Sequence, residues 1–338
     1  MDLNMIWFLL VGVLIVGYAV LDGFDLGVGS LYYLLGKTEE EKRILINSVG
    51  PFWDGNEVWL LTGGGALFAA FPLVYASVFS GFYMAMMLVL LGLILRAVGI
   101  EFRNKFEAAE WRRRWDFLFF LGSFLPALLF GVAVGNVARG LPLDSSYNYT
   151  GGFLDLLNPY SLLLGLLGLS AFLMQGLTYI LMKTEGVLQE RAQNLFSKTW
   201  LAFVVLHILG AFYTYQVAPE LFENYMRMPL LLLIPLVTFT GVVLARRAVS
   251  QDMYGLGFAG SSLAVAGMIL TLALGMFPNL VPAADPGLSL TIYNAASSQL
   301  TLKAMLIIAL TGVPIVLFYT IYVYRVFRGK VKLEQGGY

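Results

Sequence analysis

The sequence has 338 residues, of which 59% are hydrophobic and only 12% are charged. Because soluble domains carry about 25% charged residues, this composition indicates a helical membrane protein, and a formal net charge of zero gives no sign of nucleic-acid binding. The chain has no cysteine, which excludes disulfides, iron–sulfur clusters and thiolate zinc sites. We expect no metal to be ligated by this chain.

Nine apolar segments follow one another along the chain, and each is about long enough for a helix to cross a bilayer. We expect one integral membrane domain over residues 1–338, with helices 1–4 within 5–138 and helices 5–9 within 159–325. The apolar N-terminus has no basic region or cleavage site, so we interpret it as the first helix and not as a signal peptide. The predicted segments are 5–35, 47–71, 75–100, 117–138, 159–182, 199–217, 229–246, 257–277 and 299–325.

The distribution of lysine and arginine over the loops predicts the orientation of these helices. One set of loops, together with the C-terminus, holds seventeen of the 21 basic residues, whereas the opposite set holds only Arg139 and Arg227. Positively charged loops stay in the cytoplasm. Nine spans then place the N-terminus outside and the C-terminus in the cytoplasm. The seventeen residues are Lys37, Lys42, Arg43, Arg103, Lys105, Arg112, Arg113, Arg114, Lys183, Arg191, Lys198, Arg246, Arg247, Arg325, Arg328, Lys330 and Lys332.

The second segment is apolar enough for a membrane but carries two carboxylates, Asp54 and Glu57, and the amide Asn56. The two acids are three residues apart, so a helix shows them on one face. A charge inside a bilayer costs about 2.5–3.5 kcal/mol and usually faces a bundle interior or a water path. The segment is therefore either a proton-handling site or a polar seam between helices.

Three consecutive glycines later in this segment predict close packing against a neighbouring helix. An oxygen or water path beside them is the alternative. The glycines are Gly63, Gly64 and Gly65.

Two further acids and one base lie at a similar depth. Asp22 and Asp25 share a face of the first segment, and Arg96 lies near the end of the third. At a rise of about 1.5 Å per residue, Asp25, Asp54 and Arg96 all come within roughly 10–16 Å of the cytoplasmic surface. Arg96 neutralises one carboxylate, and the surplus must be protonated, hydrated or paired with a cation of another chain.

Three other features have ordinary structural interpretations. Gly27 and Gly29 in the first segment let another helix approach closely, and a phosphate loop is a poor interpretation because no strand precedes them. The single histidine, His207, is interpreted as a hydrogen-bonded core residue and not as a haem ligand. The charged run from Glu39 to Arg43 is typical of a solvated loop.

Several long motifs carry a family resemblance. They are YAVLDGFDLGVG, INSVGPFWDGNEVWLLTGGGALFAAFP and FSGFYMAMMLVLLGLILRAVGIEFR, followed by GSFLPALLFGVAVGN, LLNPYSLL, QGLTY and SLTIYNAASSQLTL. With these motifs the chain resembles subunit II of the cytochrome bd-type quinol oxidases over nearly its whole length. The loop around Glu220 to Arg227 is short for that family.

The resemblance implies an all-α fold of nine transmembrane helices, arranged as two four-helix bundles and one peripheral helix. It also implies a quinol:dioxygen oxidase whose haem b and haem d groups lie on subunit I, which binds the quinol. Subunit II of this family supports the haem subunit, helps to supply protons or oxygen, and in some members holds a structural quinone. The resemblance leaves open which quinone is used and whether a small single-helix subunit is present.

The resemblance also implies roles for the buried polar residues. Asp54 matches an acidic residue on the proton path of the family, and we expect Glu57 and Asp25 to belong to the same path. Asp25 and Arg96 match positions linked to assembly of the haem sites. The side chains expected to share this structural role are Asp22 and Asn56. One histidine cannot ligate several haems, so the donor set agrees with haems on a partner.

Two alternatives remain at this point. An ion-coupled transporter also uses buried carboxylates and glycine-interrupted helices, but it predicts inverted repeats and a midplane site, which we do not find in the sequence. A purely structural scaffold subunit has the same polar seam without a proton path. A visible spectrum of the purified complex separates the transporter from the oxidase, because the transporter is colourless.

Overall fold

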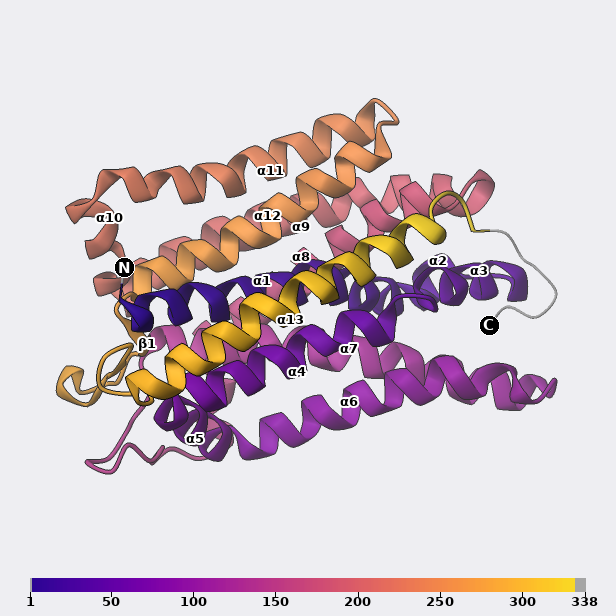
Figure 1. The fold of residues 1–338 in the computed structure, drawn as a ribbon. Coiled ribbons are helices and arrows are strands. Elements are labelled where there is room, and N and C mark those ends of the chain that lie inside the picture. The colour runs from indigo at the N-terminus through magenta and orange to yellow at the C-terminus, as the bar shows by residue number, and fades with distance from the viewer. Residues whose placement is uncertain (1, 332–338) are drawn as a thin grey trace.

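Long α-helices that run side by side make up most of the computed structural model, which describes residues 2–331 (Figure 1). Lys332, one of the seventeen basic residues counted above, lies outside the described residues. The helices are α1 (Leu3–Ser30), α2 (Tyr32–Leu35), α3 (Glu39–Val49), α4 (Trp53–Ala70), α5 (Pro72–Gly81), α6 (Tyr83–Phe102), α7 (Ala109–Arg139), α8 (Pro159–Lys183), α9 (Gly186–Val217), α10 (Glu223–Arg227), α11 (Leu233–Ser250), α12 (Tyr254–Met276) and α13 (Gln299–Val326). The strands are β1 (Asn279–Val281) and β2 (Leu290–Thr291), and the 3-10 helices are η1 (Arg103–Lys105), η2 (Leu154–Leu157), η3 (Pro219–Phe222), η4 (Pro229–Leu232) and η5 (Pro286–Leu288).

Eight helices within residues 2–331 are long and apolar enough to cross a membrane. The predicted count of nine is not confirmed, because α4, which corresponds to the second predicted segment, includes Asp54, Asn56 and Glu57 and is not apolar enough to be counted. Its 18 residues span about 27 Å, slightly less than the hydrocarbon core of about 30 Å. α4 nevertheless packs along α1 and lies among the long helices in Figure 1.

Several predicted boundaries differ from the structure. α7 and α9 begin earlier than expected, at Ala109 and Gly186, and the first three segments differ as well. The first helix ends at Ser30 and does not continue to residue 35, because the chain turns into the short helices α2 and α3. The second predicted helix starts later, at Trp53, since Pro51 has no backbone N–H and lies in the turn between α3 and α4. The third is divided at Phe82 into α5 and α6.

The long helices form two four-helix bundles, which confirms the predicted fold. The first bundle consists of α1, α4, α6 and α7, and the second consists of α8, α9, α11 and α12 (Figure 1). The last helix, α13, contacts α1 and α4 from the outside. Leu302 is its only buried residue among those described, so α13 is the peripheral helix.

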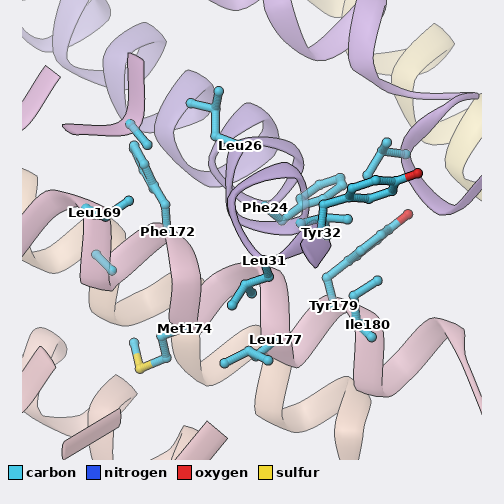
Figure 2. Packing of buried hydrophobic residues seen from close by; sticks show 14 of the residues in the cluster. Phe24, Leu26, Leu31, Tyr32, Leu169, Phe172, Met174, Leu177, Tyr179 and Ile180 are labelled. Atoms are coloured by element: carbon cyan, nitrogen blue, oxygen red, sulfur yellow. The ribbon is translucent and has the colours of Figure 1, made fainter. Parts of the chain in front are cut away.

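The two bundles meet where α1 packs against α8 (Figure 2). Phe24 stacks on Tyr179 with ring centroids 4.0 Å apart. Close to this pair, a Cβ atom added to Gly176 would lie 2.7 Å from the carbonyl carbon of Gly27. No side chain fits between these backbones. The prediction that Gly27 permits the close approach of another helix is therefore confirmed.

The two ends of the helix array differ in charge. The end at which α1 and α13 finish is called the basic end from here on, and basic residues along it include Lys37, Arg103, Lys183, Arg191 and Arg246. At the opposite end, β1 and β2 form a small antiparallel sheet. There the backbone N–H of Ser297 donates to the carbonyl of Ala70 at 2.9 Å, which ties the start of α13 to the end of α4.

Candidate functional site

A polar cluster is buried between α1, α4 and α6, in the half of the bundle nearer the basic end. Arg96 Nη1 on α6 donates to Asp22 Oδ1 on α1 at 2.7 Å. Its Nη2 donates to Glu57 Oε2 on α4 at 2.9 Å. Asp22 and Arg96 are completely buried, whereas the Glu57 side chain is 23% exposed. One guanidinium thus links three helices, as its planar fork of donors allows.

Asn56 extends the cluster to the second acid of α1. Its Nδ2 donates to Asp25 Oδ2 at 2.8 Å and to the carbonyl of Leu21 at 3.1 Å. Its Oδ1 accepts a hydrogen bond of 3.0 Å from the hydroxyl of Tyr324 on α13. The amide therefore connects a buried carboxyl group with the peripheral helix. Sequence reasoning placed Asn56 beside the acids but gave no sign of Tyr324, which lies 268 residues away.

The cluster has more acid than base. It holds three carboxyl groups but only one guanidinium: Arg96 pairs with Asp22 and Glu57, and Asp25 is held by the amide of Asn56 instead. Within the described residues, Asp22 Oδ2, Asp25 Oδ1 and Arg96 Nε are buried without a hydrogen-bond partner, as is the hydroxyl of Tyr18. A buried polar group left without a partner costs about 1–3 kcal/mol. The cluster can therefore take up protons without becoming positively charged, and it has oxygen atoms free to hold them.

Asp54 lies outside this cluster. It is exposed, and it forms no ion pair within residues 2–331. Residues three apart on a helix point about 60° away from each other, which lets Glu57 face Arg96 while Asp54 faces the outside of the chain. The expected group of four acids beside Arg96 is therefore a group of three.

The glycine triplet packs less closely than expected. A Cβ added to Gly63 would lie 3.7 Å from Leu14 on α1, in ordinary van der Waals contact. At Gly64 and Gly65, the same atom would have no neighbour within 4 Å in the described part of the chain. Within the described residues the expectation of helix packing therefore holds only at Gly63, and the other two glycines leave two positions of α4 without a side chain or a close neighbour.

A second ionic cluster, which sequence reasoning missed, lies at the basic end. Asp116 on α7 is 1% exposed and accepts hydrogen bonds from Arg103 Nε at 2.5 Å, Lys42 Nζ at 2.8 Å and the Tyr32 hydroxyl at 2.7 Å. The fully buried Arg103 also pairs with Glu39 at 2.9 Å. These contacts tie α2, α3 and η1 to the start of α7, so they fix the ends of the first bundle.

The charged run from Glu39 to Arg43 belongs to helix α3, so its interpretation as a solvated loop is wrong. A capping box starts the helix: Glu41 N–H donates to Thr38 Oγ1 at 3.2 Å, and Thr38 N–H donates to Glu41 Oε2 at 3.1 Å. Arg191 Nη1 donates to the same carboxylate at 3.0 Å. Burial raises the pKa of Glu41, but these hydrogen bonds outweigh it and lower the pKa below its ordinary value of 4.5. The threonine-x-x-glutamate spacing was the available signal.

His207 lies in the middle of α9, with its ring centroid 5.6 Å from that of Phe203. Its Nδ1 is buried without a hydrogen-bond partner among the described residues, so the expected hydrogen-bonded histidine is wrong. The part of the chain that the structure describes contains no group of three or more histidine, aspartate or glutamate side chains able to hold a metal. The haems implied by the resemblance need several axial nitrogen or sulfur donors, and one imidazole does not fit that requirement.

Known proteins match this chain over nearly its full length. A family model described as cytochrome bd terminal oxidase subunit II matches residues 3–327. The cytochrome bd-I ubiquinol oxidase subunit 2 of Escherichia coli K12 is 41% identical, with 98% of this chain and 96% of that protein aligned. The cytochrome bd ubiquinol oxidase subunit 2 of Bacillus subtilis is 40% identical over 99% of this chain and 98% of that protein. A solved structure of bd oxidase from Geobacillus thermodenitrificans has a TM-score of 0.81 at 17% identity, and the alignment covers 97% of this chain and 99% of the chain in that structure. This likeness supports the fold.

Proposed function

Because this chain belongs to the cytochrome bd terminal oxidase subunit II family, and so is a subunit of a haem-containing quinol oxidase complex, we propose that it is the non-haem subunit, which supports a haem-bearing subunit I and supplies it with protons. The complex oxidises quinol and reduces dioxygen in the aerobic respiratory chain. The observation that carries the proposal is the surplus of buried carboxyl groups around Arg96.

In this proposal the basic end faces the cytoplasm and the N-terminus lies outside, in a bacterial inner membrane. The seventeen-to-two distribution of lysine and arginine supports this orientation. The reduction of dioxygen consumes protons, and the cytoplasm supplies them. The Arg96 cluster lies in the half of the bundle nearer this side, so it stands on the path by which protons enter.

Haem b and haem d are proposed to lie on subunit I, where they supply electron transfer and dioxygen reduction. The donor set of this chain supports that division, because its single histidine and lack of cysteine do not provide the axial ligands of several haems. The contribution of this chain is then to hold and move protons and to fix the shape of the complex.

The proposed proton route uses the carboxyl groups of α4 and α1. Asp54, exposed on α4, exchanges protons at the outside of the chain. Glu57, about one turn further along the same helix, leads to the buried cluster, in which Asp25 is held by Asn56. Protons pass between carboxyl groups through hydrogen bonds or intervening water. Arg96 is a positioning residue, since it holds one carboxylate of α1 and one of α4 in fixed places.

Replacing Asp54 by asparagine in the intact complex tests this route. Asp54→Asn keeps the shape of the side chain but cannot carry a proton, and we expect turnover with quinol and dioxygen to fall by about tenfold or more. The haem content, measured from the visible spectrum, should stay normal because Asp54 forms no ion pair with any of residues 2–331. Glu110→Gln is the matched control, since Glu110 is also exposed and lies at the start of α7.

Three results are informative. A loss of turnover in Asp54→Asn alone, at normal haem content, supports the proton route. Normal turnover at normal haem content contradicts it and favours a purely structural subunit. Equal losses in Asp54→Asn and Glu110→Gln also contradict it, because they indicate a general effect of surface charge and not a specific relay.

A further inference from the structure

A cavity opens at the basic end, between α2 and the first half of α9, well away from the Arg96 cluster. Its volume is about 450 Å³, and it is lined by Leu34, Arg191, Asn194, Leu195 and Lys198. Helix α2 contributes the leucine at position 34, and α9 contributes the other four residues. The positions 191, 194, 195 and 198 are three or four residues apart, so they form one face of α9. The cavity thus combines two cations, one amide and two apolar side chains.

The polar side chains of the cavity have hydrogen-bond donors that are not used within the described residues. Arg191 uses only Nη1, which donates to the carbonyl of Leu35 and, at 3.0 Å, to Glu41. These two contacts fix the guanidinium but leave Nη2 and Nε without a partner among residues 2–331. Asn194 and Lys198 are exposed, and their side chains form no hydrogen bond or ion pair in the same part of the chain. Three side chains therefore present unused N–H groups to one space.

The charge around the cavity favours an anion. Glu41 balances Arg191, whereas Lys198 has no acidic partner in the described residues. Arg246, whose Nη1 donates to the hydroxyl of Ser197 at 2.5 Å, does not line the cavity. Glu190 is exposed on the same helix but does not line the cavity.

The position of the cavity indicates that the anion comes from a lipid headgroup and not from solution. Lys198 directly precedes the apolar run 199–217 of α9, so it lies at the level where a membrane changes from headgroups to acyl chains. Leu34 is 55% exposed beside it and provides an apolar surface. A free anion from solution gains nothing by contacting an apolar surface. A lipid, by contrast, places its phosphate against Arg191 and Lys198 and its acyl chains along Leu34.

We propose that this cavity binds the phosphate group of an anionic phospholipid from the membrane leaflet at the basic end. Arg191 and Asn194 donate to the phosphate oxygens in fixed directions, and Lys198 adds a mobile positive charge from the acyl-chain side. The bound lipid fills the space between α2 and α9, so it links the end of the first bundle to the second bundle. This site is independent of the proton route, and neither depends on the other.

Lipid binding to the detergent-purified, intact oxidase complex tests the proposal. Phosphatidylglycerol is titrated into the complex, and bound lipid is counted by native mass spectrometry, with phosphatidylcholine as the zwitterionic comparison. A lysine near an anionic lipid changes its binding by about fivefold, so Lys198→Gln should weaken phosphatidylglycerol by that factor. Lys105→Gln is the matched control, because Lys105 is an exposed lysine at the basic end of the other bundle. Arg191 is left unchanged because it pairs with Glu41.

A second variant, Asn194→Ala, keeps all charges and removes only the directed amide donor. We expect it to weaken phosphatidylglycerol as well, and the unfolding temperature of both variants should match that of the unchanged complex, since both side chains are exposed. Equal weakening by Lys198→Gln and Lys105→Gln would overturn the proposal, because the lipid would then follow the general surface charge. Equal binding of phosphatidylcholine, or displacement of the lipid by millimolar inorganic phosphate, would overturn the assignment to an anionic phospholipid.

Discussion

Replacing Arg96 by methionine should destabilise the first bundle more than most single substitutions. Arg96→Met keeps an unbranched stem comparable to the aliphatic part of arginine but removes the guanidinium and its contacts of 2.7 Å to Asp22 and 2.9 Å to Glu57. Asp22 is completely buried, so no water replaces the lost partner, whereas the partly exposed Glu57 can be hydrated. Removing one member of a buried ion pair costs about 3–5 kcal/mol. We expect most of this cost to come from Asp22.

The assay is the unfolding temperature of the purified complex together with its haem-to-protein ratio. Arg96→Met should lower both, because α1, α4 and α6 lose their common contact. The double variant Arg96→Met with Asp22→Asn should recover a large part of the stability, since it no longer leaves a buried charge without a partner. Arg96→Met with an unchanged unfolding temperature and full haem content would refute the reasoning. A double variant no better than the single one would refute the assignment of the cost to Asp22.

Two further predictions concern packing and pH. Gly27→Ala places a methyl group against the backbone of α8. We expect the free energy of unfolding to fall by about 1–3 kcal/mol, measured as a lower unfolding temperature. Gly12→Ala is the control, because a Cβ atom at Gly12 meets nothing within 4 Å. The pKa of Glu41 is lower in the folded chain than its ordinary value, so its contribution to stability is present above that value and is lost as the pH falls through the folded pKa. Glu41→Gln should therefore lower the unfolding temperature at neutral pH and make it less sensitive to acid; an unchanged acid response would contradict the stabilising role of the Arg191–Glu41 pair.

Much of the candidate site could be predicted because helices convert sequence positions into depth. Counting residues at about 1.5 Å each placed Asp25 and Arg96 at one level, and the structure brings both into one polar cluster. Rotation about the helix axis is harder to predict. Asp54 and Glu57 are equally compatible with one polar face, and only the position of Arg96 on α6 decides which acid points inward.

The basic end could be predicted less well, because charged residues near a membrane surface suggest solvation. The buried contacts of Asp116 depend on α2, α3 and η1 folding back over the end of the bundle. The four residues of α2 are too few to show a periodic apolar pattern, and α3 begins with charged residues before its buried positions Leu45, Ile46 and Val49. The capping box of Thr38 and Glu41 and the three acids of the first turn were the local signals that a helix begins there, and nothing local indicates that Arg103 becomes fully buried.

We expect the partner subunit to bind at the outer face of α4. Asp54 is exposed on this helix, and a Cβ atom added to Gly64 or Gly65 would have no neighbour within 4 Å in the described part of the chain. A carboxylate facing lipid costs about 2.5–3.5 kcal/mol, whereas a second chain can offer it a polar contact and can approach the glycines closely. In the proposed route, Asp54 would pass protons between subunits, and Arg96 would hold the cluster together inside this one. Loss of turnover at full haem content in Asp54→Asn, beside loss of haem in Arg96→Met, would separate these two roles.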